Sequence, residues 1–186
     1  MPSQEPSQGP SQGPSQGDEV ALVLAARGGD RAAFGTLYER YGRMVHGVLL
    51  CRVPRGQVED LVQDVFLNAL KRLDSLRDPE RFGGWLAVMA RNRATDFHRR
   101  SRETVELTDE IPGAVADDEA EALAVLATLR TLPEAFRETL VLRLLEGMTG
   151  PEIAARTGMT EGSVRVNLHR GMKLLRAKLG VESGHV

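Results

Sequence analysis

Apolar side chains recur every three or four residues along most of this chain, a spacing typical of helices with one buried face. Glycine pairs and prolines interrupt the pattern and mark the helix ends. The segments predicted to be helical are 18–27, 30–52, 57–76, 82–102, 120–131, 133–147 and two further helices between 149 and 179. Aromatic residues make up only 4% of the chain, which favours aliphatic helical cores over a β-sandwich. We therefore predict an all-α fold.

The same spacing predicts which side of each helix is buried. In 30–52 the predicted core positions are Phe34, Leu37, Tyr38, Tyr41, Val45, Val48 and Leu49. In 57–76 they are Val58, Leu61, Val62, Val65, Phe66, Ala69, Leu70 and Leu73. In 82–102 they are Phe82, Leu86, Met89, Ala90 and Phe97. Charged and amide side chains occupy the other side of 57–76, which is therefore predicted to face solvent or a partner.

The strongest local signals lie in 149–179. Thr149 and Glu152 have the spacing of a capping box, in which each side chain accepts a hydrogen bond from the other residue's backbone N–H. Gly158 is placed to end the first helix in a left-handed conformation, and Thr160 is placed to cap the second helix. A short helix, a glycine turn and a longer helix form the helix-turn-helix pattern, whose second helix enters the DNA major groove.

The second of these helices separates apolar from basic positions. Its predicted buried positions are Val164, Leu168, Leu175 and Leu179. Its outer positions are Arg165, Val166, His169, Arg170 and Lys173. Residues 165–178 include five Lys or Arg and no Asp or Glu, and this one-sided basic charge predicts DNA binding. An ordinary amphipathic hairpin with a solvated basic face is the alternative.

The end of the helix 82–102 is also basic, with five arginines between 91 and 102 and Asp96 as the single acid. Trp85 and Phe97 interleave with this run. Aromatic rings and guanidinium planes stack on unpaired bases while the positive charge holds phosphates, so the segment suits a single strand. If both aromatic rings are buried, the arginines form only a solvated face, and the pattern alone leaves both interpretations open.

Two segments of unusual composition divide the chain. Residues 103–121 contain eight Asp or Glu and no Lys or Arg, and they predict a flexible acidic linker between two small helical domains. Residues 2–17 repeat the unit PSQE or PSQG without apolar side chains, which predicts disorder. The predicted organisation is a tail 1–17, a helical domain 18–102, a linker 103–121, a helix-turn-helix domain 122–180 and a tail 181–186.

Composition narrows the class of function. The single cysteine, Cys51, excludes an internal disulfide framework and fits a reducing compartment. No apolar run approaches the roughly 20 residues that span a bilayer, and the N-terminus lacks the features of a secretory signal. We therefore predict a cytoplasmic protein without membrane insertion. The four histidines are scattered, and there is no Cys/His metal spacing or Gly-rich phosphate loop, so we expect no enzyme, cofactor or metal site.

Three segments, in a fixed order, resemble a bacterial RNA polymerase sigma factor. They are QVEDLVQDVFLNALKRL, RFGGWLAVMARNRATDFHRR and LPEAFRETLVLRLLEGMTGPEIAARTGMTEGSVRVNLHRGMKLLRAKL. The short two-domain form is similar to the extracytoplasmic-function group, and the resemblance covers about residues 27–179. It implies an alternative sigma factor, without catalysis of its own, that binds core RNA polymerase and directs promoter recognition, DNA melting and transcription initiation. It also implies an anti-sigma factor as an inhibitory partner.

The resemblance assigns a role to each helical surface. The helix 57–76 is implied to bind core polymerase through Asp60, Gln63, Asp64, Leu67 and Asn68. The helix 82–102 is implied to open and read the minus-ten element on the non-template strand through Trp85, Asn92, Arg93, Asp96, Arg99 and Arg100. The helix-turn-helix is implied to read the minus-thirty-five duplex through Thr160, Ser163, Arg165, Val166, His169, Arg170 and Lys173.

Other functions remain as alternatives. The main one is an independent helix-turn-helix regulator whose N-terminal helices sense a ligand or dimerise. Residues 57–100 discriminate between the two hypotheses, because a sensor domain needs neither a polymerase-docking face nor a basic helix with interleaved aromatic rings. An interaction-only protein does not account for two separate basic surfaces.

Overall fold

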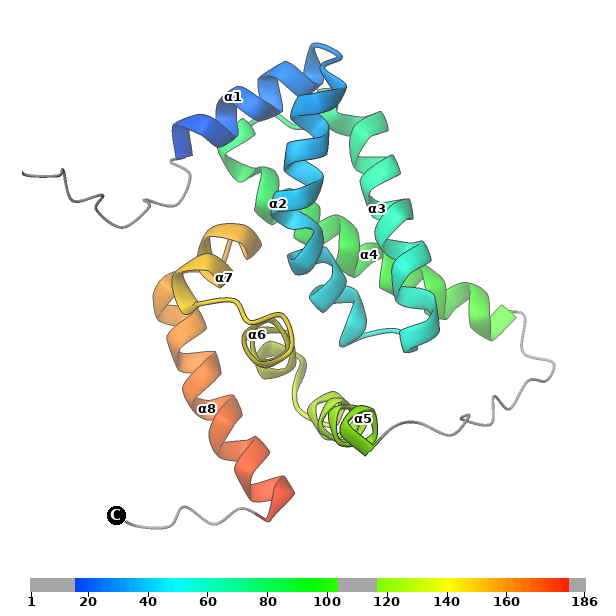
Figure 1. Ribbon diagram of the computed structural model, residues 1–186, viewed down its shortest axis with the longest axis vertical. Helices are drawn as coiled ribbons and strands as arrows, with labels where there is room; N and C mark the ends of the chain where they lie inside the picture. Colours follow the sequence, from blue (N-terminus) through cyan, green and yellow to red (C-terminus); the bar gives the residue numbers. More distant parts are fainter. Residues whose placement is uncertain (1–15, 104–116, 181–186) are drawn as a thin grey trace, which may run out of the picture.

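A computed structural model describes residues 16–103 and 117–180 of the 186-residue chain, with side chains from 18 to 101 and from 124 to 180. These residues form helices and no strand, which confirms the all-α fold (Figure 1). The α-helices are α1 (Gln16–Arg27), α2 (Arg31–Leu50), α3 (Val58–Arg72), α4 (Phe82–Glu103), α5 (Asp117–Arg130), α6 (Glu134–Leu144), α7 (Gly150–Thr157) and α8 (Glu161–Leu179). Short 3-10 turns occupy Arg55–Gln57, Leu73–Ser75 and Pro79–Arg81.

In the N-terminal half, formed by α1 to α4, the central helix is α2. Its start is fixed by Asp30, whose carboxylate accepts hydrogen bonds from the backbone N–H groups of Ala32 at 2.8 Å and Ala33 at 3.1 Å. Such a cap stabilises a helix by about 1 kcal/mol. Tyr41 of α2 and Phe82 at the start of α4 are both fully buried, and their rings meet edge to face with 5.2 Å between centroids. The apolar faces of α2, α3 and α4 thus share one core.

In the C-terminal half, α6 packs against α5, α7 and α8. The closest approach of α8 to α6 is at Gly171, where an added Cβ would lie 2.9 Å from Leu140 Cδ1 and 3.1 Å from Phe136 Cβ. A glycine therefore allows the two helix axes to lie closer than any other residue would. Leu140 and Ile153, both fully buried, fill the space beneath α8 and α7.

The local signals of the helix-turn-helix are confirmed. The Thr149 hydroxyl accepts a hydrogen bond from the Glu152 N–H at 3.4 Å, and the Glu152 carboxylate accepts one from the Thr149 N–H at 2.8 Å. Gly158 ends α7 with φ of 74°, a left-handed conformation that favours glycine. The Thr160 hydroxyl then caps α8 by accepting a hydrogen bond from the Ser163 N–H at 3.1 Å. These contacts fix the angle at which α8 leaves the turn.

The two halves pack directly against each other, which the sequence pattern did not predict. Helix α6 lies against α2, and α7 lies against α4 (Figure 1). At Gly47 an added Cβ would lie 2.7 Å from Leu142 Cδ2 and 2.8 Å from Glu146 Cγ. At Gly83 it would lie 2.6 Å from the Arg156 carbonyl oxygen. Because backbone and side chains approach so closely, the buried residues of both halves form one continuous cluster.

Three of the predicted core positions are instead exposed. Leu70 is 45% exposed because it continues the outer face of α3 one turn after Leu67. Leu179 is 44% exposed because α8 has 19 residues and α6 has 11, so the last turn of α8 extends beyond its neighbour. Tyr38 is 40% exposed, although its ring packs on Phe66 with 4.4 Å between centroids.

Most helix bounds agree with the predicted ranges, with four differences. Helix α6 ends at Leu144, three residues before the predicted end at 147. Helix α1 begins at Gln16 and so includes the last two residues of the PSQG repeat. Helix α3 ends at Arg72 and passes into a 3-10 turn. Helix α5 begins at Asp117, inside the segment predicted to be linker. The remainder of that linker and most of the two predicted tails lie outside the described residues, so the domain organisation stays a prediction.

Candidate nucleic-acid interface

The outer face of α8 presents the predicted base-reading side chains to solvent. All seven residues predicted to contact the minus-thirty-five duplex are exposed, from Thr160 to Lys173. Val166 is 42% exposed, which leaves its methyl groups available to a partner. Within the described residues, the guanidinium groups of Arg165 and Arg170 have no carboxylate partner. This face can therefore bind a polyanion without first losing an ion pair.

Two of the residues predicted to contact DNA, Thr160 and Ser163, also stabilise the start of α8. Besides capping the helix, the Thr160 hydroxyl forms a hydrogen bond of 2.8 Å with the Ser163 hydroxyl. Both hydroxyls therefore stabilise the first turn, and the positive end of the helix dipole is available to a phosphate there. Glu161, also in this first turn, is exposed and opposes such an anion.

The outer face of α3 carries the five residues predicted to bind polymerase, and all five are exposed. Leu67 is 55% exposed, the highest value for a large apolar side chain among the described residues. Asp64 differs from the other four because it already has a partner. The Nε of Arg93, on α4, donates a hydrogen bond to its carboxylate at 3.1 Å. One ion pair thus links the predicted polymerase surface to the predicted minus-ten surface.

The predicted minus-ten residues follow one side of α4, at helical spacings. Asn92, Arg99 and Arg100 are exposed, whereas Trp85 is half-buried and packs on Phe82 with 5.9 Å between ring centroids. The Asp96 carboxylate forms an ion pair with Arg99, one helical turn away, with 3.1 Å between Oδ1 and Nη2. Phe97 is half-buried too, and both aromatic rings pack against the core while the polar tips reach solvent, so the single-strand interpretation stays a prediction.

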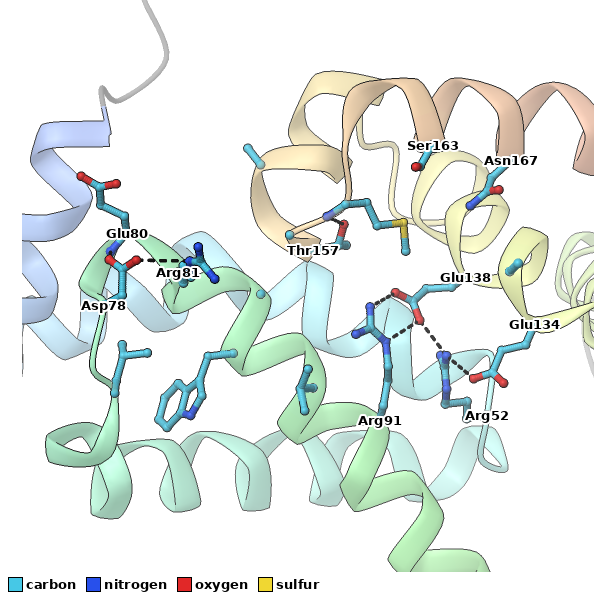
Figure 2. A pocket seen from close by; sticks show the side chains of 18 of the residues that line it. Arg52, Asp78, Glu80, Arg81, Arg91, Glu134, Glu138, Thr157, Ser163 and Asn167 are labelled. Atoms are coloured by element: carbon cyan, nitrogen blue, oxygen red, sulfur yellow. Dashed lines mark hydrogen bonds and ion pairs between the residues drawn. The ribbon is translucent and has the colours of Figure 1, made fainter.

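A buried ion-pair cluster joins the two halves, and sequence reasoning missed it. Glu138 of α6 is only 2% exposed. Arg91 of α4 donates to both of its oxygens, from Nη2 to Oε1 at 2.7 Å and from Nε to Oε2 at 3.1 Å. Arg52, just after α2, donates from Nη2 to Oε2 of Glu138 and to Oε1 of Glu134, both at 2.7 Å (Figure 2). Arg52, Arg91, Glu134 and Glu138 are called the Glu138 cluster below.

The Glu138 carboxylate is held in its charged form. Burial alone raises its pKa, but the hydrogen bonds and positive charges of Arg91 and Arg52 outweigh burial and lower it. The only visible signal in the sequence was an acidic side chain two positions before the apolar run 140–142. Its partners lie 47 and 86 residues away, so no local pattern identifies them.

Further hydrogen bonds cross between the halves. His46 Nδ1 lies 2.7 Å from Glu146 Oε1 of the C-terminal half. Its Nε2 lies 3.6 Å from Glu59 of its own half, at ion-pair distance. Arg156 of α7 donates to the Arg40 carbonyl at 2.7 Å. Arg130 of α5 donates to the carbonyls of Leu50, the last residue of α2, and of Val53. Together with the Glu138 cluster on α6, these side chains link α5, α6 and α7 to the N-terminal half by hydrogen bonds.

A cavity of about 1340 Å³ lies between the halves, next to the Glu138 cluster (Figure 2). Helix α4 lines it with Trp85, Val88 and Arg91. Helix α8 lines it with Ser163 and Asn167, whose side chains extend toward it. The predicted minus-ten helix and the start of the predicted minus-thirty-five helix thus border the same space.

The described ranges hold no metal site, no membrane-spanning helix and no reactive thiol. No three His, Cys, Asp or Glu side chains lie close enough there to hold a metal ion. None of the helices is long and apolar enough to cross a membrane, again for the described ranges alone. Cys51 is buried, and burial raises the pKa of its thiol to about 11, so it is unreactive at neutral pH.

Both halves match known family descriptions. Residues 37–104 match Sigma-70 region 2, and residues 122–175 match region 4 of Sigma-70. The first match includes α3 and α4 with their predicted polymerase and minus-ten residues. The second includes the helix-turn-helix through Leu175.

Individual proteins give the same result over most of the chain. The ECF RNA polymerase sigma factor BldN of Streptomyces coelicolor is 32% identical over 83% of this chain, which spans 63% of that protein. The RNA polymerase sigma factor CnrH of Cupriavidus metallidurans is 34% identical over 87% of this chain and 94% of its own length.

Two solved structures are similar. One is CnrH in complex with the cytosolic domain of CnrY, with a TM-score of 0.63 and 30% identity over 89% of this chain and 99% of that chain. The other is the sigma factor RpoE in complex with the anti-sigma factor NepR from Bartonella quintana, with a TM-score of 0.52 and 21% identity. It covers 80% of this chain and 97% of that chain, and it supports the fold alone.

Proposed function

This chain belongs to the bacterial RNA polymerase sigma factors of the extracytoplasmic-function type, and on that premise we propose how its three exposed surfaces divide the work. The outer face of α3 binds core polymerase, α4 engages the minus-ten strand, and α8 reads the minus-thirty-five duplex. The observation that carries this proposal is the exposure of the polar side chains on all three helices while their apolar sides share one core.

For α8 the support is its unpaired basic face. Arginine forms two hydrogen bonds to the O6 and N7 atoms of guanine in the major groove, and a valine methyl group can contact a thymine methyl group. Arg165 and Arg170 supply the first kind of contact and Val166 the second. Lys173, further along the helix, reaches the flanking phosphates, which position the protein without reading sequence.

For α4 the support is an aromatic ring beside polar and basic tips. Opening a promoter requires bases to leave the stack, at a cost of a few kcal/mol per base, so a prepared site for an unstacked base lowers that cost. Asn92 is exposed on the side of α4 that also carries Asp96 and Arg99. Its amide has donors and an acceptor for a base edge, and the arginines hold the strand.

For α3 the support is a mixed apolar and acidic face. Leu67 at its centre is an exposed apolar anchor, and the neighbouring acids suit a basic partner surface. The ion pair of Asp64 with Arg93 means that docking at α3 and strand binding at α4 influence each other.

The packed arrangement of the halves has to open for this function. The minus-ten and minus-thirty-five elements are separated by about 25 base pairs, or about 80 Å of duplex at about 34 Å per turn of about 10.5 base pairs. In this structure α4 and α7 touch: a Cβ added at Gly84 would lie 3.4 Å from the Gly158 Cα. A chain that engages both elements must therefore separate the two halves, and the acidic linker then sets the distance that they can reach.

The same proposal extends to partners and location. The relative CnrH was solved in complex with the cytosolic domain of CnrY, and we infer that a comparable partner protein, an anti-sigma factor, inhibits this chain. We also infer that the chain has no catalytic activity of its own, and that it acts in the cytoplasm, where bacterial RNA polymerase works.

The test is run-off transcription with purified core polymerase and fragments of the host genome. Core enzyme with this chain is expected to start at specific sites that core enzyme alone does not use. Once a promoter is found, Arg165→Ala or Arg170→Ala is expected to weaken binding of the minus-thirty-five duplex by about 1–3 kcal/mol for each hydrogen-bonded base that the side chain no longer reaches.

The matched control for these substitutions is Lys178→Ala. It removes the same charge from an exposed position near the end of α8, outside the predicted contacts. It is expected to leave base specificity unchanged. If core polymerase does not recruit the chain, or if all three substitutions have the same effect, the proposed division of work is wrong and an independent regulator is favoured.

A further inference from the structure

The Glu138 cluster has the composition of an anion site that is already filled. Two guanidinium groups converge on one carboxylate, and Arg91 grips both of its oxygens. Arg–carboxylate and Arg–phosphate pairs share this planar two-bond geometry, so a carboxylate can stand where a phosphate oxygen pair would bind. The carboxylate comes from the C-terminal half, whereas both cations belong to the N-terminal half.

We propose that Arg52 and Arg91 form a binding site for a backbone phosphate of the unpaired promoter strand, and that Glu138 fills this site while the two halves are packed together. This inference rests on the proposed minus-ten role of α4. It adds Arg52 and Arg91 to the residues proposed to hold that strand. It also gives Glu138 a role as an internal competitor of DNA.

The two cations stay in place when α6 leaves. Arg52 Nη1 donates to the Val48 carbonyl of its own half at 2.9 Å, and this bond does not involve α6. Arg91 is carried by α4, whose buried side is anchored in the N-terminal core through Ala90 and Ala94. Both acids of the cluster, Glu134 and Glu138, lie on α6. Separation of the halves therefore removes the negative charges and leaves a preformed positive site.

A strand and the closed contact exclude each other at this point. Glu138 already occupies Nε and Nη2 of Arg91, so a phosphate cannot take up the same two-bond geometry without displacing it. Two half-buried arginines without an anion would raise the free energy of the open chain. A phosphate satisfies the same guanidinium groups, so strand binding stabilises the open chain at the expense of the closed one.

The surroundings favour a nucleic-acid strand over a free phosphate ion. The adjoining cavity of about 1340 Å³ is far larger than one ion needs. Trp85 and Val88 line it from α4, and Val88 is 48% exposed. An aromatic ring beside an arginine pair is the combination on which single-stranded bases stack while the backbone is held.

The experiment measures opening and strand binding on the full chain. Dyes on Lys71→Cys of α3 and Lys178→Cys of α8, both exposed positions in different halves, report separation by energy transfer. The native Cys51 stays unlabelled because it is 1% exposed and its thiol has a raised pKa. Strand binding is measured with labelled oligothymidylate, since phosphate contacts carry no sequence information.

The main variant is Glu138→Gln, which keeps the side-chain volume and removes the competing charge. It is expected to lower energy transfer and to raise oligothymidylate affinity about tenfold, the effect of removing one charged hydrogen-bonded pair. Glu39→Gln, on the exposed side of α2, is the matched control for the change in net charge and is expected to alter neither quantity. Gly47→Val is a second way to separate the halves, since its side chain collides with Leu142 and Glu146 while Glu138 stays intact.

The site itself is tested by Arg91→Ala in the Glu138→Gln and Gly47→Val chains. The expected result is a loss of most of the gained affinity. The slope of the logarithm of affinity against the logarithm of salt concentration should also become shallower by about 0.7, the contribution of one phosphate contact on a single strand. Inorganic phosphate, as a separate arm, is expected to compete with the strand only weakly. Competition at equal concentration would instead assign the site to a free anion.

Each outcome decides one point. If Glu138→Gln leaves energy transfer unchanged, Glu138 is not what holds the halves together, and that part of the inference is overturned. If opened chains bind the strand equally well with and without Arg91, the phosphate site is overturned while the role of α4 stands. If opened chains bind no strand at all, the proposed minus-ten function of α4 fails, and the inference fails with it.

Discussion

The outer faces of α8 and α4 both carry arginines, but these arginines differ in whether a carboxylate already holds them. On α8, Arg165 and Arg170 have no such partner within the described residues. On α4, Arg91 is bound to Glu138, Arg93 to Asp64 and Arg99 to Asp96. One basic helix is therefore ready to bind DNA, and the other has to exchange partners first.

This difference fits the two tasks proposed for the helices. A duplex already exists before a sigma factor arrives, so a reading helix can be exposed permanently. An unpaired strand forms only during promoter opening, and permanently free arginines on α4 would bind any polyanion beforehand. On this proposal, strand binding must first displace internal carboxylates, which raises its free-energy cost. These carboxylates are Glu138 on α6, Asp64 on α3 and Asp96 on α4 itself.

The largest expected effect concerns the anchoring of α8. Gly171→Val places branched methyl groups against the fully buried Leu140, and overpacking of this kind lowers the free energy of unfolding by about 1–3 kcal/mol. The substitution is also expected to tilt α8 and weaken duplex binding, although no DNA-facing residue changes. Thermal unfolding and duplex titration measure the two effects.

Gly162→Ala is the control for this prediction. It lies on the same helix, and a Cβ there meets nothing closer than the Thr160 hydroxyl oxygen at 4.0 Å. Because alanine favours helix by about 1 kcal/mol over glycine, this variant is expected to be at least as stable as the native chain. Equal destabilisation by both variants would contradict the close approach of α8 and α6.

An intermediate effect is expected from the link between α3 and α4. Asp64→Ala removes an acid from the predicted polymerase surface, so it should weaken core-polymerase binding. It also frees Arg93, so it should strengthen binding of oligothymidylate to an opened chain. The pair is largely exposed and contributes about 0.2–1 kcal/mol, so the unfolding temperature should fall by only a few degrees. Polymerase pull-down and strand titration are measured side by side.

Asp74→Ala serves as the comparison for that variant, because it removes the same charge from an exposed position outside the predicted docking face. It should change neither interaction. An unchanged pull-down with Asp64→Ala would indicate that the acids on α3 form only a solvated face.

The smallest expected effect is a pH dependence of the closed arrangement. The hydrogen bond to Glu146 is the largest influence on His46 and raises its pKa above 6.5, with Glu59 adding to the rise and burial and Arg55 opposing it. A raised pKa means that the charged imidazole stabilises the folded contact. That contribution is fully present below pH 6.5 and is lost as pH rises through the raised value.

Energy transfer between the two halves should therefore decline slightly as pH increases from about 6 to about 8. His46→Gln should remove this slope while leaving the Glu138 cluster intact. If the native chain and His46→Gln show the same slope, another group is responsible for it.

Local chemistry explains which features were predictable from the sequence. The capping box of Thr149 and Glu152, the left-handed Gly158 and the Thr160 cap each depend on residues within four positions of one another, and all are confirmed. The exposure of Arg165 and the other outer positions of α8 follows from helical spacing in the same way.

Features that depend on distant partners were not predictable. Leu70 fits the apolar spacing of α3, yet it is 45% exposed because no helix in the described part of the chain covers that side. Gly47 and Gly83 carried no signal, since their role is set by neighbours about a hundred and about seventy positions along the chain. Glu138 was visible only as an acid in an apolar stretch, and its partners became known only from the packing of α6 against α2 and α4.

The burial of Glu138 has a consequence for how the chain responds to dissolved ions. Mobile ions screen exposed charges strongly and buried pairs much less, so added salt weakens DNA contacts while it leaves the carboxylate between Arg52 and Arg91 almost unaffected. Rising ionic strength therefore shifts the competition in one direction only, toward the packed chain. At low salt concentration, promoter binding is favoured over the packed chain. The concentration of simple electrolytes would then regulate initiation without a dedicated receptor.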